Sequence, residues 1–436
     1  MEHFLEGRIL HAEQVEQLEH YVARGEVELI QGIQQHRCMR CHNTRRQYLI
    51  TLHCARCNDV CTYCRKCIQL GRVSSCTTLV RWCGPAAKRT GNHTLQLGEL
   101  TKQQQRASDE LIASLQAKRN HLLHAVCGAG KTEILFQPIL YALQQRLRVC
   151  IATPRTDVVL ELYPRLQKAF PQTFVQALYG GADVARRFSP LIVATTHQLL
   201  RFQQAFDFII VDEADAFPYT ADEMLQRAVM KAKTEATPIC YVTATPSMKL
   251  LQQRKKERWG YSFLPSRYHG HALPIPRIVI VKRLEKMLEK GKLPTEICEW
   301  LTLCVEQNKP FLLFLPTIEL IEKSIALVQA VVPNVEAVHA SDEQRKDKVL
   351  ALRNGQLNGV VTSTILERGI TISNVQVAVV CADAAVFTAG ALIQISGRVG
   401  RNVAYPSGDI VLFSSAITIA MDEAIAEMKR LNAVVQ

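Results

Sequence analysis

The sequence predicts an α/β protein with two parallel-sheet domains preceded by a small cysteine-rich domain. From about residue 93 onward, apolar strands alternate with amphipathic helices, a pattern typical of doubly wound parallel sheets. Nine of the 15 cysteines lie between Cys38 and Cys83, in a part of the chain without that alternation. We therefore expect four segments: an acidic helical segment (1–35), a cysteine-rich domain (36–92) and two α/β domains (93–262 and 263–436).

The composition narrows the class of protein. The net charge of +12 favours a polyanionic partner, although surface charge also serves solubility alone. Six cysteines are scattered singly beyond Cys83, which fits a reducing compartment and argues against a disulfide scaffold. The most apolar stretch, Val375–Ile395, contains Asp383, and no N-terminal apolar leader is evident. We expect a cytoplasmic protein that is at most peripheral to the inner face of a membrane.

The first 35 residues show an approximate helical stripe. Leu10, Val15, Leu18 and Val22 are spaced so that they face one side of a helix. This spacing predicts a packing helix without chemistry of its own.

The cysteine spacing predicts a zinc site. Cys38 with Cys41 and Cys64 with Cys67 form CxxC pairs, and four thiolates from two such turns satisfy tetrahedral zinc. A metal can also hold together a segment too small for its own core. We favour these four as ligands. Cys54 and Cys57 are the alternative second pair, and a second metal that uses Cys61, Cys76 or His53 is left open.

The cysteine-rich domain is also basic. Between Arg37 and Arg89 eleven Lys and Arg residues accompany one acidic residue, Asp59. This excess is larger than a zinc–tetrathiolate centre needs, so it favours contact with nucleic-acid phosphates beside aromatic residues that stack on bases. A protein-docking or purely structural zinc ribbon is the alternative. The residues expected to contact DNA are Arg45, Arg46, Arg65 and Lys66.

The segment Ala125–Thr132 matches the phosphate-binding pattern [AG]-x-x-x-x-G-K-[ST] between an apolar strand and a helix. The loop residues Gly128, Ala129 and Gly130 curl backbone N–H groups around a phosphate, and the helix N-terminus faces the same anion. Lys131 reaches the terminal phosphates, Thr132 ligates Mg²⁺, and Glu133 follows in the first helical turn. We expect a nucleoside triphosphatase.

Upstream of this loop lies Leu100-Thr101-Lys102-Gln103-Gln104. A glutamine can read the N6 and N7 edges of adenine, so Gln104 is a candidate ATP selector. Thr101 can equally serve as a helix N-cap.

Polar residues follow the predicted strands of the first α/β domain at their carboxyl ends, where parallel sheets bind ligands. After the strand Phe208–Asp212, Asp212 can hold Mg²⁺ and Glu213 can activate the attacking water. Other strand ends carry Thr153 and Arg155, Thr195 and His197, and Thr243 and Thr245.

These motifs, with the literal DEAD sequence Asp212–Asp215, resemble the superfamily 2 helicases and translocases over about residues 95–436. The resemblance implies two RecA-like motor domains with ATP between them and nucleic acid across both. It places four residues on the nucleic-acid track and implies that Thr243 and Thr245 couple hydrolysis to it. The four are Thr153, Arg155, Thr195 and His197.

Two stretches of the last domain resemble the remaining motifs. Val360–Thr371 resembles motif V, which implies that Thr362 and Thr364 face nucleic acid while Glu367, Arg368 and Gly369 approach the nucleotide. Gln394–Arg401 resembles motif VI, in which two arginines three apart on one helical face point at the γ-phosphate. Arg398 and Arg401 are the expected arginine fingers.

The combination resembles a narrower group. The segments Tyr63–Arg72, His124–Glu133, Ala194–Leu200 and Val211–Tyr219 are similar to those of the ComFA family of late-competence proteins in naturally transformable Gram-positive bacteria. The resemblance implies an ATP-driven motor on single-stranded DNA at the cytoplasmic side of an uptake channel. By the same resemblance, its partners are the membrane channel ComEC and the phosphoribosyltransferase-like ComFC, and an oligomer is left open.

Two other interpretations compete with this one. A PriA-like replication-restart or repair helicase also joins zinc-bound cysteines to a superfamily 2 motor, but residues 1–95 are short for its DNA-binding domain. A zinc-ribbon scaffold with an inactive motor would have no reason to retain Lys131, Glu213, Arg398 and Arg401 together. No strand-separating wedge is readable, so we expect translocation without strong unwinding.

Overall fold

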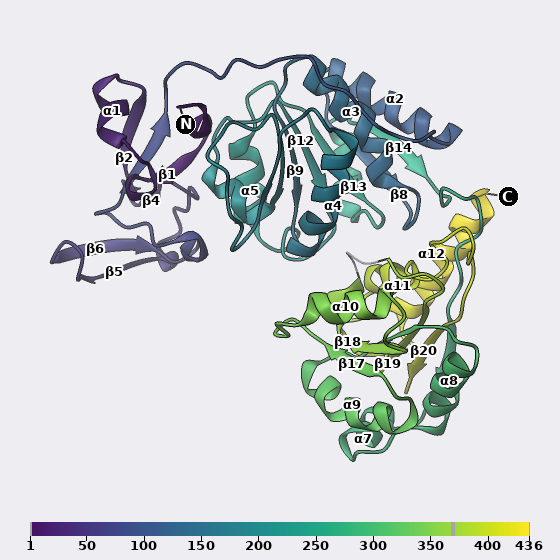
Figure 1. The fold of residues 1–436 in the computed structure, drawn as a ribbon. Coiled ribbons are helices and arrows are strands. Elements are labelled where there is room, and N and C mark those ends of the chain that lie inside the picture. Colours follow the sequence, from purple (N-terminus) through teal and green to yellow (C-terminus); the bar gives the residue numbers. More distant parts are fainter. Residues whose placement is uncertain (1, 368–370, 436) are drawn as a thin grey trace. The chain divides into compact units, whose positions relative to one another are not determined.

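The structure, a computed structural model, describes residues 2–367 and 371–435 (Figure 1). The chain divides into two compact units, one of Met1–His124 with Lys131–Phe263 and the other of Ala125–Gly130 with Leu264–Gln436. In the part of the chain described, no helix has both the length and the apolar character needed to span a bilayer.

The N-terminal segment is built on a small antiparallel sheet rather than on a packing helix. The sheet has the order β1-β7-β2, formed by Ile9–His11, Thr78–Trp82 and Val27–Gln31. Among the described residues of this segment, only Leu18–Ala23 forms an α-helix, α1. The expectation of a helix over residues 1–35 is therefore wrong. Gly25, at φ +65°, follows α1 and precedes β2, and the apolar residues of β1 and β2 pack in the sheet instead.

Two hairpins and the loops that follow them contain eight of the nine cysteines between Cys38 and Cys83. The first pairs β3 (Ile33–Gln34) with β4 (Arg37–Cys38), and the second pairs β5 (Leu49–Cys54) with β6 (Asp59–Cys64). Cys41, Cys57, Cys67 and Cys76 lie in the turns and loops that adjoin these strands.

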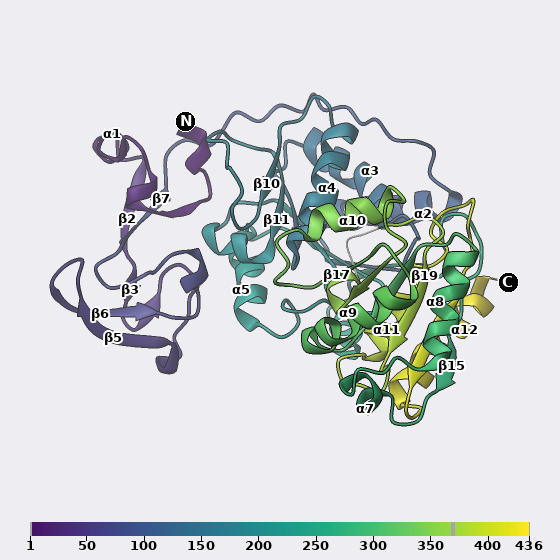
Figure 2. The same ribbon diagram turned by 60° about the horizontal axis from the view of Figure 1, so that its bottom comes forward.

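The first α/β domain contains the predicted parallel sheet. Its seven strands have the order β10-β11-β9-β12-β13-β8-β14, and the paired strands from β10 to β8 run parallel. The strands are β8 His121–Ala125, β9 Val149–Thr153, β10 Val175–Leu178, β11 Leu191–Thr195, β12 Phe208–Asp212, β13 Ile239–Thr243 and β14 Gly260–Leu264. The helices are α2 Lys102–Gln116, α3 Lys131–Gln144, α4 Thr156–Ala169, α5 Glu223–Ala232 and α6 Met248–Lys256 (Figure 2).

The second α/β domain repeats the design with a six-stranded sheet of order β15-β20-β19-β16-β18-β17, all pairs parallel. Its strands are β15 Arg277–Ile280, β16 Phe311–Phe314, β17 Val335–Val338, β18 Gly359–Thr362, β19 Gln376–Val380 and β20 Ile410–Ser414. Its helices are α7 Leu284–Glu289, α8 Thr295–Glu306, α9 Ile318–Val331, α10 Arg345–Arg353, α11 Ala389–Ser396 and α12 Ile419–Val435. The predicted pair of RecA-like domains is confirmed.

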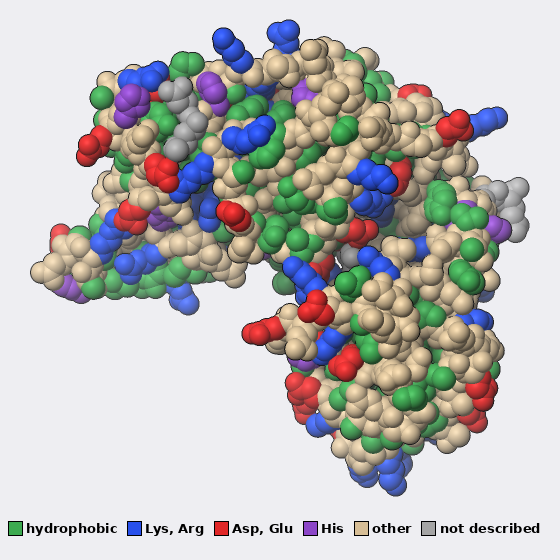
Figure 3. Space-filling model, in the orientation of Figure 1, with side chains coloured by type: hydrophobic (Ala, Val, Ile, Leu, Met, Phe, Trp, Pro, Cys, Tyr) green, Lys and Arg blue, Asp and Glu red, His purple; other side chains and the backbone are tan. Residues whose placement is uncertain are grey.

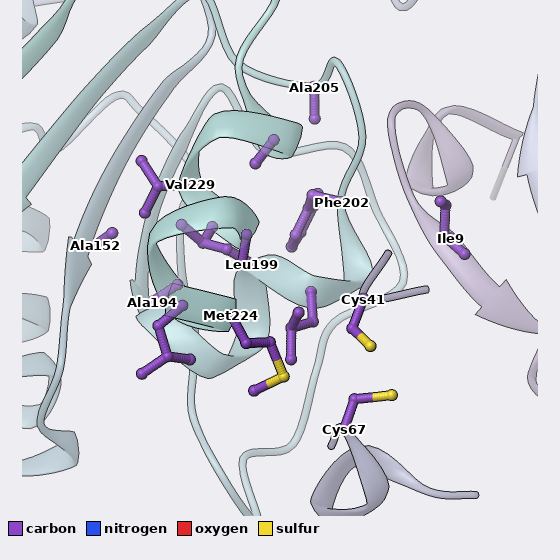
Figure 4. Close-up of a cluster of buried hydrophobic side chains, with 14 of the residues drawn as sticks. Ile9, Cys41, Cys67, Ala152, Ala194, Leu199, Phe202, Ala205, Met224 and Val229 are labelled. Atoms are coloured by element: carbon purple, nitrogen blue, oxygen red, sulfur yellow. The ribbon is translucent and has the colours of Figure 1, made fainter. Parts of the chain in front are cut away.

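The cysteine-rich region and the first α/β domain share one hydrophobic core (Figure 4). Cys41, Cys67 and Ile9 from the N-terminal part pack in the same cluster as Leu199 and Phe202, which belong to the 3₁₀ helix Thr196–Arg201 and the residue after it. The sequence predicted separate domains. The N-terminal sheet has a small core of its own around Leu10 and Val80, while the residues of the first four-cysteine group pack in the core of the neighbouring domain.

Candidate functional site

The phosphate loop joins a fully buried strand to a helix. Gly128 and Gly130 have φ values of +84° and +77°, a region that side chains with a Cβ rarely adopt, so both glycines are required by the backbone. Helix α3 begins at Lys131, and Lys131 and Thr132 lie half-buried in its first turn. Glu133 is different from its neighbours, because its carboxylate pairs with Arg165 of α4. This ion pair connects α3 to α4, and contact of Glu133 with the nucleotide stays a prediction.

Gln104 takes part in a helix cap. Thr101 is the N-cap of α2 and accepts a hydrogen bond from Gln104 N, while Gln104 Oε1 accepts one from Thr101 N at 2.9 Å. This reciprocal pair is a capping box. Thr101 therefore serves as a helix N-cap, as the alternative interpretation expected. Adenine selection by Gln104 stays a prediction.

The carboxyl end of β12 holds the catalytic candidates. Asp212 is the last residue of the strand, and its Oδ1 accepts a hydrogen bond from Glu213 N at 2.9 Å. Glu213 has φ +54°, a left-handed conformation that costs about 1 kcal/mol in a residue with a Cβ. Such backbone strain is concentrated at functional sites, where the surrounding structure enforces it.

Asp215 connects this strand end to the next one. Thr243 Oγ1 donates to Asp215 Oδ1 at 2.6 Å, and Thr245 Oγ1 donates to Asp215 Oδ2 at 2.7 Å. Thr245 N in turn donates to Thr243 Oγ1 at 3.0 Å. The two hydroxyls predicted to couple hydrolysis to the nucleic-acid track are therefore bound to the loop that carries Asp212 and Glu213.

The other predicted track residues differ in their access to solvent. Thr153 and Thr195 are buried at the ends of β9 and β11, and Thr153 is fully inaccessible. Arg155 and His197 are partly exposed, and burial lowers the pKa of His197. Arg155 and His197 therefore offer more surface for a direct contact than Thr153 and Thr195, and the contact of all four with nucleic acid stays a prediction.

In the second α/β domain Thr362 is fully buried, and its hydroxyl donates to the carbonyl of Val338 at 2.8 Å. It has no surface for nucleic acid, whereas Thr364 is partly exposed in the turn Thr364–Glu367. The predicted nucleotide contacts Arg368 and Gly369 lie outside the described residues.

The two expected arginine fingers do not lie on a helical face. Helix α11 ends at Ser396, and Arg398 and Arg401 lie in the turn after it. Arg398 is 3% exposed, and its Nε donates to the carbonyl of Glu367 at 2.9 Å. Arg401 Nε donates to the carbonyl of Gly397 at 2.8 Å. Gly397 is the C-cap of α11, and the chain then turns at Gly400, which has φ +73°.

The four favoured cysteines come together as one cluster. Cys38, Cys41, Cys64 and Cys67 are buried, and their sulfur atoms lie within 4.8 Å of one another. The pairs Cys38–Cys67 and Cys41–Cys64 are 3.8 and 3.6 Å apart. A tetrahedral site with Zn–S bonds of about 2.3 Å needs sulfurs about 3.8 Å apart, so this thiol set fits zinc. The alternative pair, Cys54 and Cys57, belongs to a different group of thiols.

Sequence reasoning missed the polar groups that support this cluster. Arg40 is buried, and its Nη2 donates to Cys67 Sγ at 3.2 Å and to the carbonyl of Cys67. Lys231 Nζ on α5 donates to the carbonyls of Arg40 and Leu200 at 2.6 and 2.7 Å, and burial lowers its pKa to about 8. No local pattern marks Lys231, because its partners lie far away in the sequence.

Several of the basic residues expected to hold DNA are engaged within the protein. Arg45 pairs with Glu223 at 2.7 Å and Lys66 with Asp222 at 3.1 Å, which joins the cysteine-rich region to α5. On the face in Figure 3, Lys and Arg side chains are interspersed with Asp and Glu. Arg46 and Arg65 are exposed, and no ion pair with a described carboxylate is formed by either. Arg45 and Lys66 thus have a structural role within the chain, and their contact with DNA stays a prediction.

Comparison with known proteins identifies three family matches along the chain. Residues 1–81 match the competence protein ComFA N-terminal domain, residues 101–253 the DEAD/DEAH box helicase domain, and residues 292–403 the helicase conserved C-terminal domain. The chain is thus a superfamily 2 ATP-hydrolysing helicase, and such domains imply ATP with a metal ion.

Individual relatives agree. The chain is 42% identical to competence protein ComFA of Bacillus subtilis over 91% of its own length and 86% of that protein. It is 36% identical to ComFA of Streptococcus pneumoniae, covering 87% and 90% of the two chains. Replication restart protein PriA of Bacillus subtilis is only a distant match, 21% identical over 50% of this chain and 29% of PriA.

The fold also matches a solved helicase structure. Dbp5 of S. cerevisiae bound to RNA and ADP BeF3 superimposes with a TM-score of 0.60 at 16% identity, covering 78% of this chain and 89% of that one. With the high identity to the two competence proteins over nearly the whole length, these findings decide the family. The chain belongs to the ComFA family of competence proteins.

Proposed function

We propose that this protein is an ATP-driven translocase on single-stranded DNA that drives the import of transforming DNA across the cytoplasmic membrane. The observation that carries the proposal is the pair of hydrogen bonds from Thr243 and Thr245 to Asp215. The loop that carries Asp212 and Glu213 responds to cleavage of the γ-phosphate in this proposal. The two hydrogen bonds connect that loop to the end of β13. Motion at one strand end is transmitted to the other, which is what a motor needs and a passive scaffold does not.

The chemistry assigns a role to each group at the nucleotide. Lys131 and the loop glycines bind the phosphates, Thr132 and Asp212 would hold Mg²⁺, and Glu213 orients and deprotonates the attacking water. When bound, Mg²⁺ neutralises charge on the phosphate oxygens. Arg398 and Arg401 stabilise the charge that develops at the γ-phosphate.

The cysteine-rich region has two roles in this proposal. The thiols of Cys38, Cys41, Cys64 and Cys67 bind a structural zinc, and the exposed Arg46 and Arg65 contact the DNA backbone. The protein acts peripherally at the inner face of the membrane, with the channel ComEC and ComFC as its partners. Family membership supports these partners.

ATP turnover of the purified protein tests the activity. We expect single-stranded DNA to stimulate turnover more than duplex DNA or RNA, and Lys131→Ala to abolish it because the terminal phosphates lose their cation. Stimulation by RNA alone, or activity that survives Lys131→Ala, would refute the proposal. Efficient unwinding of tailed duplexes would refute translocation without strand separation.

A further inference from the structure

The second hairpin carries a group of four thiols apart from the first cluster. Cys54, Cys57, Cys61 and Cys76 place their sulfur atoms within 4.8 Å of one another. The Cys54–Cys76 and Cys57–Cys61 sulfurs are 3.8 and 3.2 Å apart, close to the roughly 3.8 Å that tetrahedral zinc requires. All four are free thiols. We propose that these four cysteines form a second zinc site, which folds the β5–β6 hairpin and ties it to the N-terminal sheet.

The burial pattern of the hairpin shows what holds it together. Between Leu49 and Cys64 the buried side chains are those of Cys54, Cys61 and Cys64, and every other residue is partly or fully exposed. The apolar Val60 is 63% exposed. A two-stranded hairpin in water is marginally stable at best. Because apolar burial cannot supply the missing free energy, metal–thiolate bonds are the stabilising interaction that the residues provide.

The two clusters alternate along the chain. Cys38 and Cys41 belong to the first, Cys54, Cys57 and Cys61 to the second, Cys64 and Cys67 to the first, and Cys76 to the second. The hairpin register pairs Leu49 with Cys64 at the open end and Cys54 with Asp59 at the turn. One cluster therefore fixes each end of the hairpin. With about 3.4 Å per residue, the separation of Cys61 from Cys64 places the clusters on the order of 10 Å apart, too far to share one ion.

Each cluster has an arginine directed at one of its sulfurs. Arg40 Nη2 donates to Cys67 Sγ at 3.2 Å in the first cluster, and Arg72 Nη2 donates to Cys54 Sγ at 3.7 Å in the second. A zinc–tetrathiolate centre has a formal charge of −2, and outer-sphere donors of this kind stabilise it. Arg40 and Arg72 therefore have a role at the two clusters that does not involve nucleic acid.

Cys76 links the second site to the N-terminal sheet. It lies two residues before β7, and its neighbour Ser75 donates its backbone N–H to the carbonyl of Thr62 on β6 at 2.8 Å. A metal bound to Cys76 therefore connects the hairpin to the β1-β7-β2 sheet. Cys57 is exposed and Cys76 partly exposed, whereas the first cluster is buried, so the second zinc should be released first to a chelator.

Zinc content measured by elemental analysis of the full-length protein tests the assignment. We expect two equivalents in the wild type and the loss of one in Cys76→Ser, whereas Cys76→His, which keeps a zinc ligand, should retain the metal. Cys83→Ser is the matched control, because Cys83 is exposed and lies in neither group. Loss of one equivalent in Cys76→Ser supports the second site whatever the first cluster binds. An unchanged metal content in Cys76→Ser overturns it.

A second measurement needs no variant and so does not depend on how a mutant folds. Cys57 and Cys83 are both exposed, so an alkylating reagent can reach each of them unless a metal holds Cys57. In wild-type protein we expect iodoacetamide to modify Cys83 first and Cys57 only after a chelator is added. Equal rates of modification in untreated protein, or a disulfide at Cys57 found by mass analysis without reductant, would overturn the proposal.

Discussion

At the scale of single residues, Asp215 is the group that joins two functional loops. Replacing Thr243 and Thr245 by Val keeps their shape but removes two hydrogen bonds to a carboxylate, each with a net value of about 1.5–3 kcal/mol. We expect basal ATP turnover to persist while translocation per ATP falls by about tenfold or more. Translocation on labelled single-stranded DNA, measured beside ATP turnover, checks this.

The control for that change is Thr220→Val. Thr220 is exposed in the loop that follows Ala216, and its hydroxyl donates to the backbone carbonyl of Ala216 at 3.5 Å. It should leave both rates unchanged. A parallel fall of turnover and translocation in the Thr243/Thr245 variant would mean that these residues serve the chemistry rather than its coupling.

The basic residues of the cysteine-rich region now divide into two groups with different expected effects. Arg46→Ala with Arg65→Ala should weaken binding to single-stranded DNA and reduce the slope of log K against log[salt] by about 1.4, or about 0.7 for each phosphate that is no longer neutralised. Arg81→Ala removes the same kind of charge, but Arg81 already pairs with Glu28. Its salt slope should match the wild type. Equal slopes in all three proteins would exclude this surface.

The buried ring of His121 should make the stability of the first unit depend on pH. Its ring lies buried between Ser114 and Ser262, at 2.9 and 3.0 Å, and burial lowers its pKa from 6.5 to about 4. Because the folded-state pKa lies below the unfolded value, the folded state is favoured above pH 6.5 and loses stability as the pH falls from 6.5 towards 4. The full loss is at most about 3 kcal/mol.

Thermal unfolding between pH 7 and pH 4.5 measures this loss. His121→Asn should reduce the fall in Tm, because it removes the titrating ring, whereas His36→Asn, at an exposed position, should not. If His121→Asn and the wild type lose the same Tm on acidification, the burial of this ring does not set the acid limit.

At the scale of elements, sequence patterns predicted the strands whose ends depend on local apolar patterning. The strands that end at Thr153, Thr195 and Asp212 follow the apolar runs of the sequence, because parallel strands buried on both faces read as continuous apolar runs. The helix expected over residues 1–35 is limited to α1, because Ile9 and Ile30 lie in strands that pair with Arg81 and Leu79 of β7, far along the chain. Arg398 and Arg401 were expected on a helix, but spacing alone could not reveal that α11 ends at Ser396.

Lys231 on α5 helps to hold the cysteine-rich region against the first α/β domain. Lys231→Met keeps the aliphatic stem but leaves the carbonyls of Arg40 and Leu200 without this donor. We expect a loss of about 1–3 kcal/mol, and thus a Tm lower by several degrees. Lys233→Met is the control, because Lys233 Nζ contacts only the nearby carbonyls of Thr234 and Glu235. Equal Tm values for the two variants would contradict this role.

At the scale of the whole molecule, the family, the two α/β domains and the grouping of the first four cysteines could be read from the sequence. The shared core could not. Nothing in the spacing of Cys41 or Cys67 indicates that they pack near Phe202, because such contacts depend on tertiary structure across more than a hundred residues. The same holds for Arg45 and Lys66, whose acidic partners lie on α5 or at its N-cap.

The shared core makes a last prediction about metal removal. If zinc organises the cysteines that pack beside Leu199 and Phe202, its release should loosen the first α/β domain as well as the cysteine-rich region. We expect hydrogen exchange to rise in Thr196–Arg201 and α5 after zinc is chelated, while β16 and β19 of the second unit keep their protection. Zinc release is followed with a chromogenic chelator in the same sample. Unchanged exchange in α5 after full release would show that the first domain is stable without its neighbour, and a uniform rise through β19 would indicate global unfolding instead.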